Sequence, residues 1–248
     1  MSYWSVAVYG GFSVGPVLGS VLHGDANYGV VWAVSAGLAL FAAVIGWFTV
    51  EVPRSAPMQR PEHLFNRGAI DPGIVLFLGL IPLAGFMAFV PPYADELNVS
   101  PGLILALYGV LILGVRIFGA RLPDRLGGRT TATIALAVVA AGFGVIATWQ
   151  TIAGLLLGTV VFASGMSLMY PALLVLALDG VREAERGSVV GTISTFFDAS
   201  QGVGALVCGA VVHFTGNGGA FTTGAICALI GLAVLRGRSA QSRAPAPA

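Results

Sequence analysis

Eight long apolar stretches dominate the sequence and limit what it can fold into. Most are close to the roughly 20 residues that an α-helix needs to cross about 30 Å of hydrocarbon. Inside a bilayer the backbone must satisfy its own hydrogen bonds, which favours helices. The sequence therefore predicts an all-α, polytopic membrane bundle of eight transmembrane helices. The predicted spans are residues 3–22, 29–50, 73–93, 101–120, 130–148, 152–178, 188–213 and 220–235.

Composition supports a membrane protein. Hydrophobic residues make up 56% of the 248 residues and charged residues only 9%, whereas about 25% of a typical soluble domain is charged. The formal net charge is +1, so the chain lacks the strongly basic surface that nucleic-acid binding requires. We expect the lipid bilayer as a partner and no nucleic acid.

Cysteine and histidine give no sign of a metal or cofactor site. Cys208 and Cys227 lie inside apolar runs, where a thiol usually serves as packing. His23, His63 and His213 are far apart and belong to no two-ligand pattern. We expect neither a metal nor a cofactor.

The arginines predict the orientation of the chain. All twelve basic residues are Arg, and they lie in or next to alternate loops and in the C-terminal tail. The intervening loops hold no arginine, and carry His23, Asp25, Asp95 and Glu96. By the positive-inside rule the arginine side is cytoplasmic. We expect a multi-pass protein of the inner (plasma) membrane with both termini in the cytoplasm.

Two spans have predicted starts. Asp71 precedes Pro72 and Ser100 precedes Pro101, so each pair offers a side-chain acceptor at the N-cap and a proline at the first helical position. The polar, proline-bearing residues 237–248 are expected to form a disordered cytoplasmic tail.

The first two spans match the last two without gaps when residue 14 is aligned with residue 203. In this register Val14-Gly15 meets Val203-Gly204 and Gly29 meets Gly218. Spans one and two would then repeat as spans seven and eight, which predicts a repeat of six helices. We expect four further helices before Met1. Residues 1–50 would be the last two helices of a first half, 51–72 a cytoplasmic linker, and 73–236 a complete six-helix second half.

Two motifs carry a family resemblance. ARLPDRLGGR, residues 120–129, resembles the cytoplasmic loop motif GxLaDrxGrr of the major facilitator superfamily, with departures at Ala120 and Gly128. GFSVGPVLGS, residues 11–20, resembles the family's helix-five signature GxxxGPxxGG, which is associated with antiporting exporters. Residues 186–204 are similar to the start of helix eleven in bacterial efflux-type members. The chain thus resembles the last eight helices of a twelve-helix transporter of this family.

The resemblance implies a secondary active transporter that exports a small molecule by proton antiport and alternating access, not an enzyme. Sugars, drugs and small metabolites are all carried by similar proteins. A second possibility is a truncated fragment without transport activity of its own, which needs the missing N-terminal helices or self-association. An intramembrane serine hydrolase using Ser164 and His213 is disfavoured, because the two lie at different depths. The chain has no GxxxxGK[ST] loop to support ATP-driven transport.

Asp198 is the strongest individual site candidate. It lies about 16 Å along its helix from Gly187, near the bilayer midplane. An aspartate at a helix centre costs about 2.5–3.5 kcal/mol on insertion scales, so it should face a cavity, find a partner or be protonated. A packing bond to a neighbouring helix is the alternative. The expected proton or substrate pathway comprises Asp198, Gln201, Thr195, Ser194 and, beside Pro171, Tyr170.

The loop that contains the motif at residues 120–129 is expected to hold the two halves in contact, as it does in the resembling family. We expect Asp124 to lie against the N-terminus of span one, near Ser2 and Tyr3, where the helix dipole favours an anion. Arg125 and Arg129 would pair with acids of the next cytoplasmic loop. These acids are Asp179, Glu183 and Glu185. The gating motif also includes Arg121, Gly127 and Arg116, although Arg116 could simply extend to the cytoplasmic surface.

Span one carries a stripe of small residues. Gly11, Gly15 and Gly19 repeat every four residues, and Pro16 interrupts the backbone hydrogen bonds beside them. Such a stripe allows close packing of another helix, a pliable interface between halves, or both.

Overall fold

The computed structural model describes residues 11, 14–15, 18–19, 21–22, 28–49, 65–119 and 125–241. Every helix or strand element assigned within these residues is helical, and seven helices are long and apolar enough to cross a membrane. They are α2 (Tyr28–Trp47), α3 (Ile70–Glu96), α4 (Pro101–Gly119), α6 (Gly128–Thr148), α7 (Ile152–Leu178), α8 (Arg186–Thr215) and α9 (Gly218–Gln241). The predicted helical membrane bundle is confirmed. Most of the first predicted span lies outside the described residues, so the count of eight stays a prediction.

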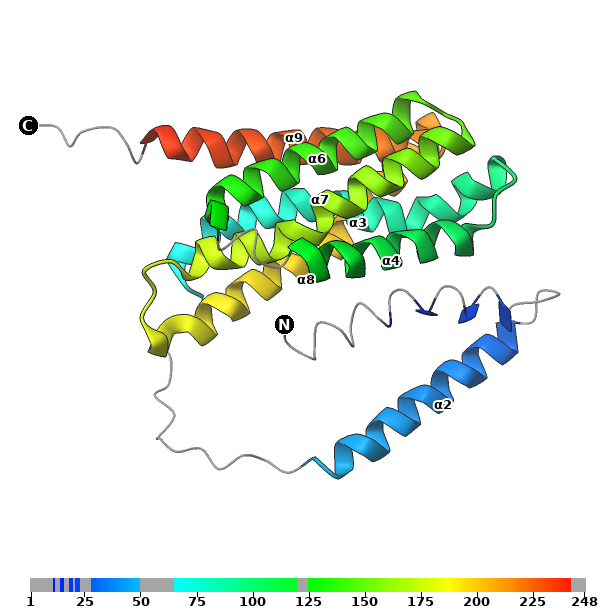
Figure 1. The fold of residues 1–248 in the computed structure, drawn as a ribbon, viewed down its shortest axis with the longest axis horizontal. Helices are drawn as coiled ribbons and strands as arrows, with labels where there is room; N and C mark the ends of the chain where they lie inside the picture. Colours follow the sequence, from blue (N-terminus) through cyan, green and yellow to red (C-terminus); the bar gives the residue numbers. More distant parts are fainter. Residues whose placement is uncertain are drawn as a thin grey trace, which may run out of the picture.

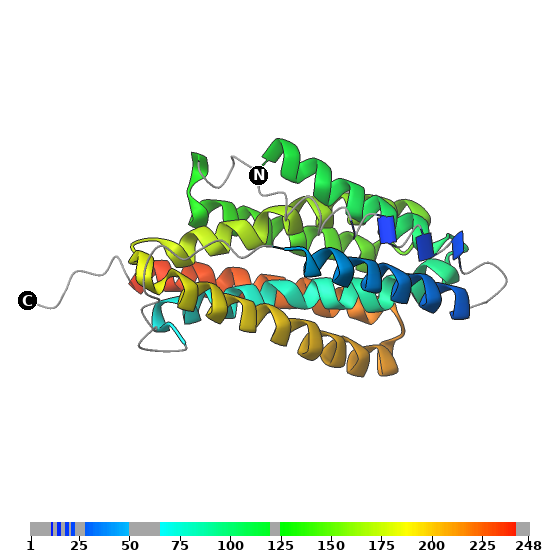
Figure 2. The same ribbon diagram turned by 90° about the horizontal axis from the view of Figure 1, so that it is seen from below.

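Six of these helices pack into one bundle, and α2 lies apart from them (Figure 1). Helix α3 contacts α8, α9, α7 and α4, while α6 packs on α7 and α9. In the most apolar stretch of α3, 61% of the residues are buried, against none in α2. The bundle is therefore organised around α3. Seen from below, its helices run nearly parallel or antiparallel along the long axis (Figure 2).

Helices α6 and α7 touch through their backbones. A Cβ added to Gly142 would lie 2.5 Å from the main-chain nitrogen of Phe162, and one on Gly165 would lie 2.7 Å from the carbonyl oxygen of Ala135. Gly158 likewise has no room for a side chain, since an added Cβ would lie 2.8 Å from the carbonyl oxygen of Gly142. Small residues allow such close packing in membranes, where dispersion contacts replace much of the hydrophobic driving force.

An aromatic cluster fills the core between five helices. Phe86 of α3 lies 5.0 Å from Tyr108 of α4 and 4.9 Å from Phe162 of α7, between ring centroids. Phe143 of α6 lies 4.7 Å from Phe162 and 5.6 Å from Phe221 of α9. The four phenylalanines are completely buried. These tilted and edge-on contacts are the arrangements that aromatic rings favour.

The starts of α3, α6 and α8 and the ends of α7 and α9 lie at one end of the bundle (Figure 1). These segments carry arginines, including Arg67, Arg129, Arg186 and Arg236. We call this the arginine-rich end. The end of α3 with Asp95 and Glu96 lies at the opposite end of the bundle.

The start of α3 differs from the prediction. A short 3₁₀ turn, η1 (Arg67–Ala69), precedes it, and the Asn66 side-chain oxygen accepts a hydrogen bond from the Gly68 nitrogen at 2.9 Å. The predicted cap at Asp71 is therefore wrong, and Asp71 and Pro72 lie in the first turn of α3. Proline is tolerated there because the first four helical N–H groups have no intrahelical acceptor. Helix α4 begins at Pro101, as predicted.

Helix α9 continues to Gln241, beyond the predicted span end at residue 235 and the predicted tail start at residue 237. A run of apolar residues marks the part of a helix that fits the hydrocarbon, but polar residues can extend the same helix outside the hydrocarbon.

Candidate functional site

The most apolar stretch of α8 is less apolar than that of each of the other six helices, and only 17% of it is buried. One side packs on α3, where a Cβ on Gly204 would lie 2.8 Å from the Ala84 Cβ. On another side, a Cβ on Gly191 or Gly202 would meet no atom within 4 Å. Among the described residues, nothing therefore covers one face of α8.

The predicted polar residues lie on or beside this uncovered face. Asp198 and Thr195 are exposed, and Ser194 and Gln201 are partly exposed. The Thr195 hydroxyl donates to the carbonyl of Gly191 at 3.0 Å. We call Ser194, Thr195, Asp198 and Gln201 the α8 polar face.

Two groups of the α8 polar face have no protein partner among the described residues. The Asp198 carboxylate makes no hydrogen bond or ion pair with any of them. The Gln201 side-chain nitrogen is buried and has no hydrogen-bond acceptor there. Within the described chain, the alternative of a packing bond between Asp198 and a neighbouring helix is not formed.

The position of Asp198 is unusual for a charged residue. In the six helices of the bundle, every other Asp, Glu or Arg lies within two turns of a helix end. Asp198 is thirteenth in the 30 residues of α8. A carboxylate this deep requires water, a partner or a proton, because lipid offers no hydrogen-bond donor.

Tyr170 reaches the polar face from α7. Its ring lies edge-on to that of Phe197, with the centroids 6.0 Å apart and the planes at 89°. Phe197 immediately precedes Asp198 and is partly exposed. It was not predicted, because an apolar residue in an apolar helix gives no signal of its own.

The predicted gating motif lies only partly within the described residues. Arg121 and Asp124 lie outside the described residues, as do Ser2, Tyr3 and Pro16, so the contact between Asp124 and span one stays a prediction. Gly127 has a φ of 81°, a conformation that favours glycine, and it directly precedes α6. Arg116 is partly exposed in the last turn of α4.

The arginines of this motif have other surroundings than predicted. Arg129 donates a hydrogen bond to the main-chain oxygen of Leu235 in α9 at 2.6 Å. Arg125 is exposed. Neither forms an ion pair with Asp179, Glu183 or Glu185 within the described chain.

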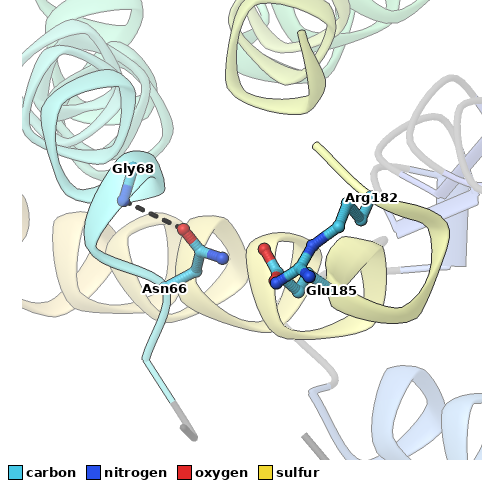
Figure 3. Close-up of polar contacts among 4 residues, drawn as sticks. All are labelled: Asn66, Gly68, Arg182 and Glu185. Atoms are coloured by element: carbon cyan, nitrogen blue, oxygen red, sulfur yellow. Dashed lines mark hydrogen bonds and ion pairs between the residues drawn. The ribbon is translucent and has the colours of Figure 1, made fainter. Parts of the chain in front are cut away.

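Glu185 instead pairs with Arg182, three residues before it (Figure 3). Such local pairing orders less of the chain than a contact between loops. Figure 3 also shows the Asn66 side chain directed at Gly68. The main-chain nitrogen of Asn66 donates a hydrogen bond to the hydroxyl of buried Thr192 at 3.0 Å, which ties the start of α3 to α8.

Two further predicted groups lack, among the described residues, the contacts that the predictions required. Gly11 and Gly15 are helical and exposed, Gly19 is helical and partly exposed, and a Cβ on any of them would meet no described atom within 4 Å. The Ser164 hydroxyl donates to the carbonyl of Val160 at 2.8 Å, and His213 lies two residues from the end of α8. Ser164 therefore does not show the hydrogen bond to histidine that a serine hydrolase requires.

Comparison with known proteins decides the family. Residues 1–205 and, in a second match, residues 73–248 match the family model of the Major Facilitator Superfamily. The chain belongs to the Major Facilitator Superfamily. The predicted resemblance is therefore confirmed. This Major Facilitator Superfamily (MFS) chain is a multi-pass membrane protein.

Its relatives are longer proteins. An uncharacterised MFS-type transporter of Salmonella typhimurium is 31% identical over 240 residues, which are 95% of this chain and 61% of that protein. Uncharacterised MFS-type transporters of Burkholderia mallei and Burkholderia pseudomallei are 25% identical over 239 residues, 94% of this chain and 58% of theirs. The MFS chain thus spans less than two thirds of the length of these relatives.

Proposed function

We propose that this MFS chain forms one side of the pathway of a secondary transporter, which exports a small molecule in exchange for protons. The α8 polar face lines that pathway, together with Tyr170. The arginine-rich end faces the cytoplasm, by the positive-inside rule. In a bacterial cell the membrane is then the inner membrane.

The position of Asp198 carries this proposal. It is exposed on the bundle in the middle of a membrane-spanning helix. Contact with lipid would cost about 2.5–3.5 kcal/mol, so water, substrate or another helix is expected to cover this face. The unpartnered nitrogen of Gln201, three residues along the helix, supports a polar occupant.

In the proposed cycle Asp198 is neutralised either by a proton or by the substrate. A secondary transporter exposes such a midplane site to the two sides of the membrane in turn. Exchange follows because release of one neutralising group allows the other to bind. The resemblance of residues 11–20 to the antiporter signature supports export.

The test uses everted membrane vesicles that contain the full chain and the dye acridine orange. Respiration acidifies the vesicles and quenches the dye, and a solute exchanged for protons restores its fluorescence. Tetraphenylphosphonium, arabinose and alanine serve as probes of three chemical classes. We expect at least one probe to restore fluorescence in vesicles with the wild type, and no probe to do so with Asp198→Asn. The control variant Asp95→Asn should respond to the same probe as the wild type, because Asp95 is an exposed acid at the C-terminal end of α3. Equal responses of wild type and Asp198→Asn would contradict the proton role.

A second candidate is a chain that does not transport alone. The observation that favours it is α2, which has no buried residue and lies apart from the bundle (Figure 1). The α8 polar face would then be covered only after assembly with further helices. In the same assay this candidate predicts no response to any probe, although the chain is present in the membrane in full length.

A further inference from the structure

Helices α6 and α9 meet at the arginine-rich end, where α6 begins and α9 ends (Figure 1). There the Arg129 guanidinium donates a hydrogen bond to the main-chain oxygen of Leu235. The next residue of α9, Arg236, is exposed. This contact places two arginine residues, one from each helix, at the same end of the interface between α6 and α9.

Apolar side chains of α9 lead from the middle of the membrane span to this charge. Ile226, Leu229 and Ala233 are exposed. They precede Arg236 by ten, seven and three residues, and this spacing places all four on one face of a helix. In a bilayer we expect acyl chains to contact this face, so Arg236 lies at the level where the chains end and the headgroups begin. We call Ile226, Leu229, Ala233, Arg236 and Arg129 the α6–α9 corner.

The two guanidinium groups of the corner favour a phosphate ligand. A guanidinium carries five N–H donors in one plane, so the hydrogen bond to Leu235 leaves donors of Arg129 for a ligand. Phosphate oxygens accept such hydrogen bonds in pairs. The bond to Leu235 also orients the guanidinium of Arg129 before a ligand arrives, which lowers the entropic cost of binding. A phosphate that also carries apolar chains is a phospholipid.

The charge balance of the corner favours an anionic phospholipid over a zwitterionic one. Neither α6 nor α9 contains an acidic residue. Helix α3 packs on α9 and contributes Asp71 at this end. One carboxylate together with two guanidinium groups leaves a net positive charge. An anionic headgroup compensates this charge, whereas the amine of a zwitterionic headgroup would add to it.

The loop between α7 and α8 differs in charge, although it lies at the same end of the bundle. It carries one arginine, Arg182, and three acids, which are Asp179, Glu183 and Glu185. Arg182 is paired with Glu185. This loop therefore offers an exposed arginine whose surroundings are acidic, and it serves as the control for the corner.

We propose that the α6–α9 corner binds an anionic phospholipid, with the lipid phosphate on Arg129 and Arg236 and the acyl chains along the apolar face of α9. The bound lipid would join the start of α6 to the end of α9 at the membrane surface, beside the contact between Arg129 and Leu235. This inference is independent of the proposed transport function, because it involves neither Asp198 nor a transported substrate.

The test measures lipid binding to the purified full chain in detergent by native mass spectrometry, which resolves each bound lipid. Dioleoyl phosphatidylglycerol is the anionic probe, and dioleoyl phosphatidylcholine is a zwitterionic lipid with the same chains. We expect phosphatidylglycerol to bind more tightly. Arg236→Gln should weaken its binding about fivefold, as expected for one arginine near an anionic headgroup. The control Arg182→Gln removes the same charge from the α7–α8 loop and should bind as the wild type does.

Two further measurements separate lipid binding from other causes. Arg236→Lys keeps the charge and should retain most of the phosphatidylglycerol binding, whereas damage to the bundle would lower the melting temperature of the variant concerned. Inorganic phosphate at millimolar concentration should not displace the lipid, because it gains no contact with the apolar face of α9. Displacement by inorganic phosphate would assign the corner to a free phosphate and reject the lipid.

Three other results would overturn the inference. Equal affinities for the two lipids would show that the headgroup charge is not recognised. Equal affinities of the wild type and Arg236→Gln for phosphatidylglycerol would exclude the corner as the site. Equal weakening by Arg236→Gln and Arg182→Gln would show a general attraction of anionic lipid to arginine and no specific site.

Discussion

The Arg129 guanidinium donates a hydrogen bond to the main-chain oxygen of Leu235 at 2.6 Å. This contact joins the start of α6 to the last turns of α9 at the arginine-rich end. Leu235 is buried, and the Arg129 side chain is partly buried. An arginine of the family's loop motif thus holds two helices of the same bundle together in this structure.

Arg129→Ala should lower the free energy of unfolding by about 1.5–3 kcal/mol, the range for hydrogen bonds that involve a charged group. Thermal unfolding of the purified chain in detergent measures the change. Arg125→Ala is the matched control, because Arg125 belongs to the same loop motif, is exposed and should have little effect. Equal destabilisation by both variants would show that the Leu235 contact contributes nothing specific.

Two glycines of α6 should respond to alanine with opposite signs. A Cβ at Gly142 would lie 2.5 Å from the Phe162 nitrogen, and one at Gly144 would meet no atom within 4 Å. Gly142→Ala should therefore destabilise the chain by about 1–3 kcal/mol through overpacking. Gly144→Ala should be neutral or stabilise it by up to about 1 kcal/mol, because alanine favours helix more than glycine does. Melting temperatures of the two variants, measured side by side, test the α6–α7 contact.

The aromatic cluster should depend strongly on Phe162, whose ring contacts Phe86, Tyr108 and Phe143. Phe162→Ala should cost about 3–5 kcal/mol, since it leaves a cavity between helices. Phe214→Ala is the control, because that ring is 84% exposed. Its effect should stay within about 0.5 kcal/mol. Unfolding in detergent with increasing denaturant gives both values, and similar midpoints would contradict the central role of the cluster.

The Asn66 side chain should stabilise the start of α3 by about 1 kcal/mol, as helix N-caps do. Asn66→Ala removes the acceptor for the Gly68 nitrogen, and Asn66→Asp keeps one. Hydrogen exchange at Gly68 and Ala69 measures the local effect. We expect faster exchange in Asn66→Ala only. Faster exchange in both variants would point to the whole amide rather than its oxygen.

The sequence was sufficient to predict most membrane spans, because an apolar run of about 20 residues is typical of a membrane-spanning helix. It also placed Asp198 on a polar helix face. The predicted N-cap at Asp71 was wrong, because the 3₁₀ turn η1 precedes α3 and has Asn66 as its side-chain cap. A pattern of apolar residues cannot show a short 3₁₀ turn outside the hydrocarbon.

The partners of side chains were harder to predict than their positions. Arg129 was expected to meet a carboxylate, but a carbonyl oxygen of α9 is its partner. Phe197 was overlooked because an apolar residue in an apolar helix gives no signal of its own. Both depend on which helices are neighbours, and spacing along one helix does not contain that information.

The backbone contact between α6 and α7 also bears on how the chain folds. The two helices are neighbours in sequence, and only residues 149–151 separate them. Closing so short a loop costs little entropy, and local contacts form faster than distant ones. We therefore expect α6 and α7 to associate early in synthesis and to offer a ready surface on which the later helix α9 assembles.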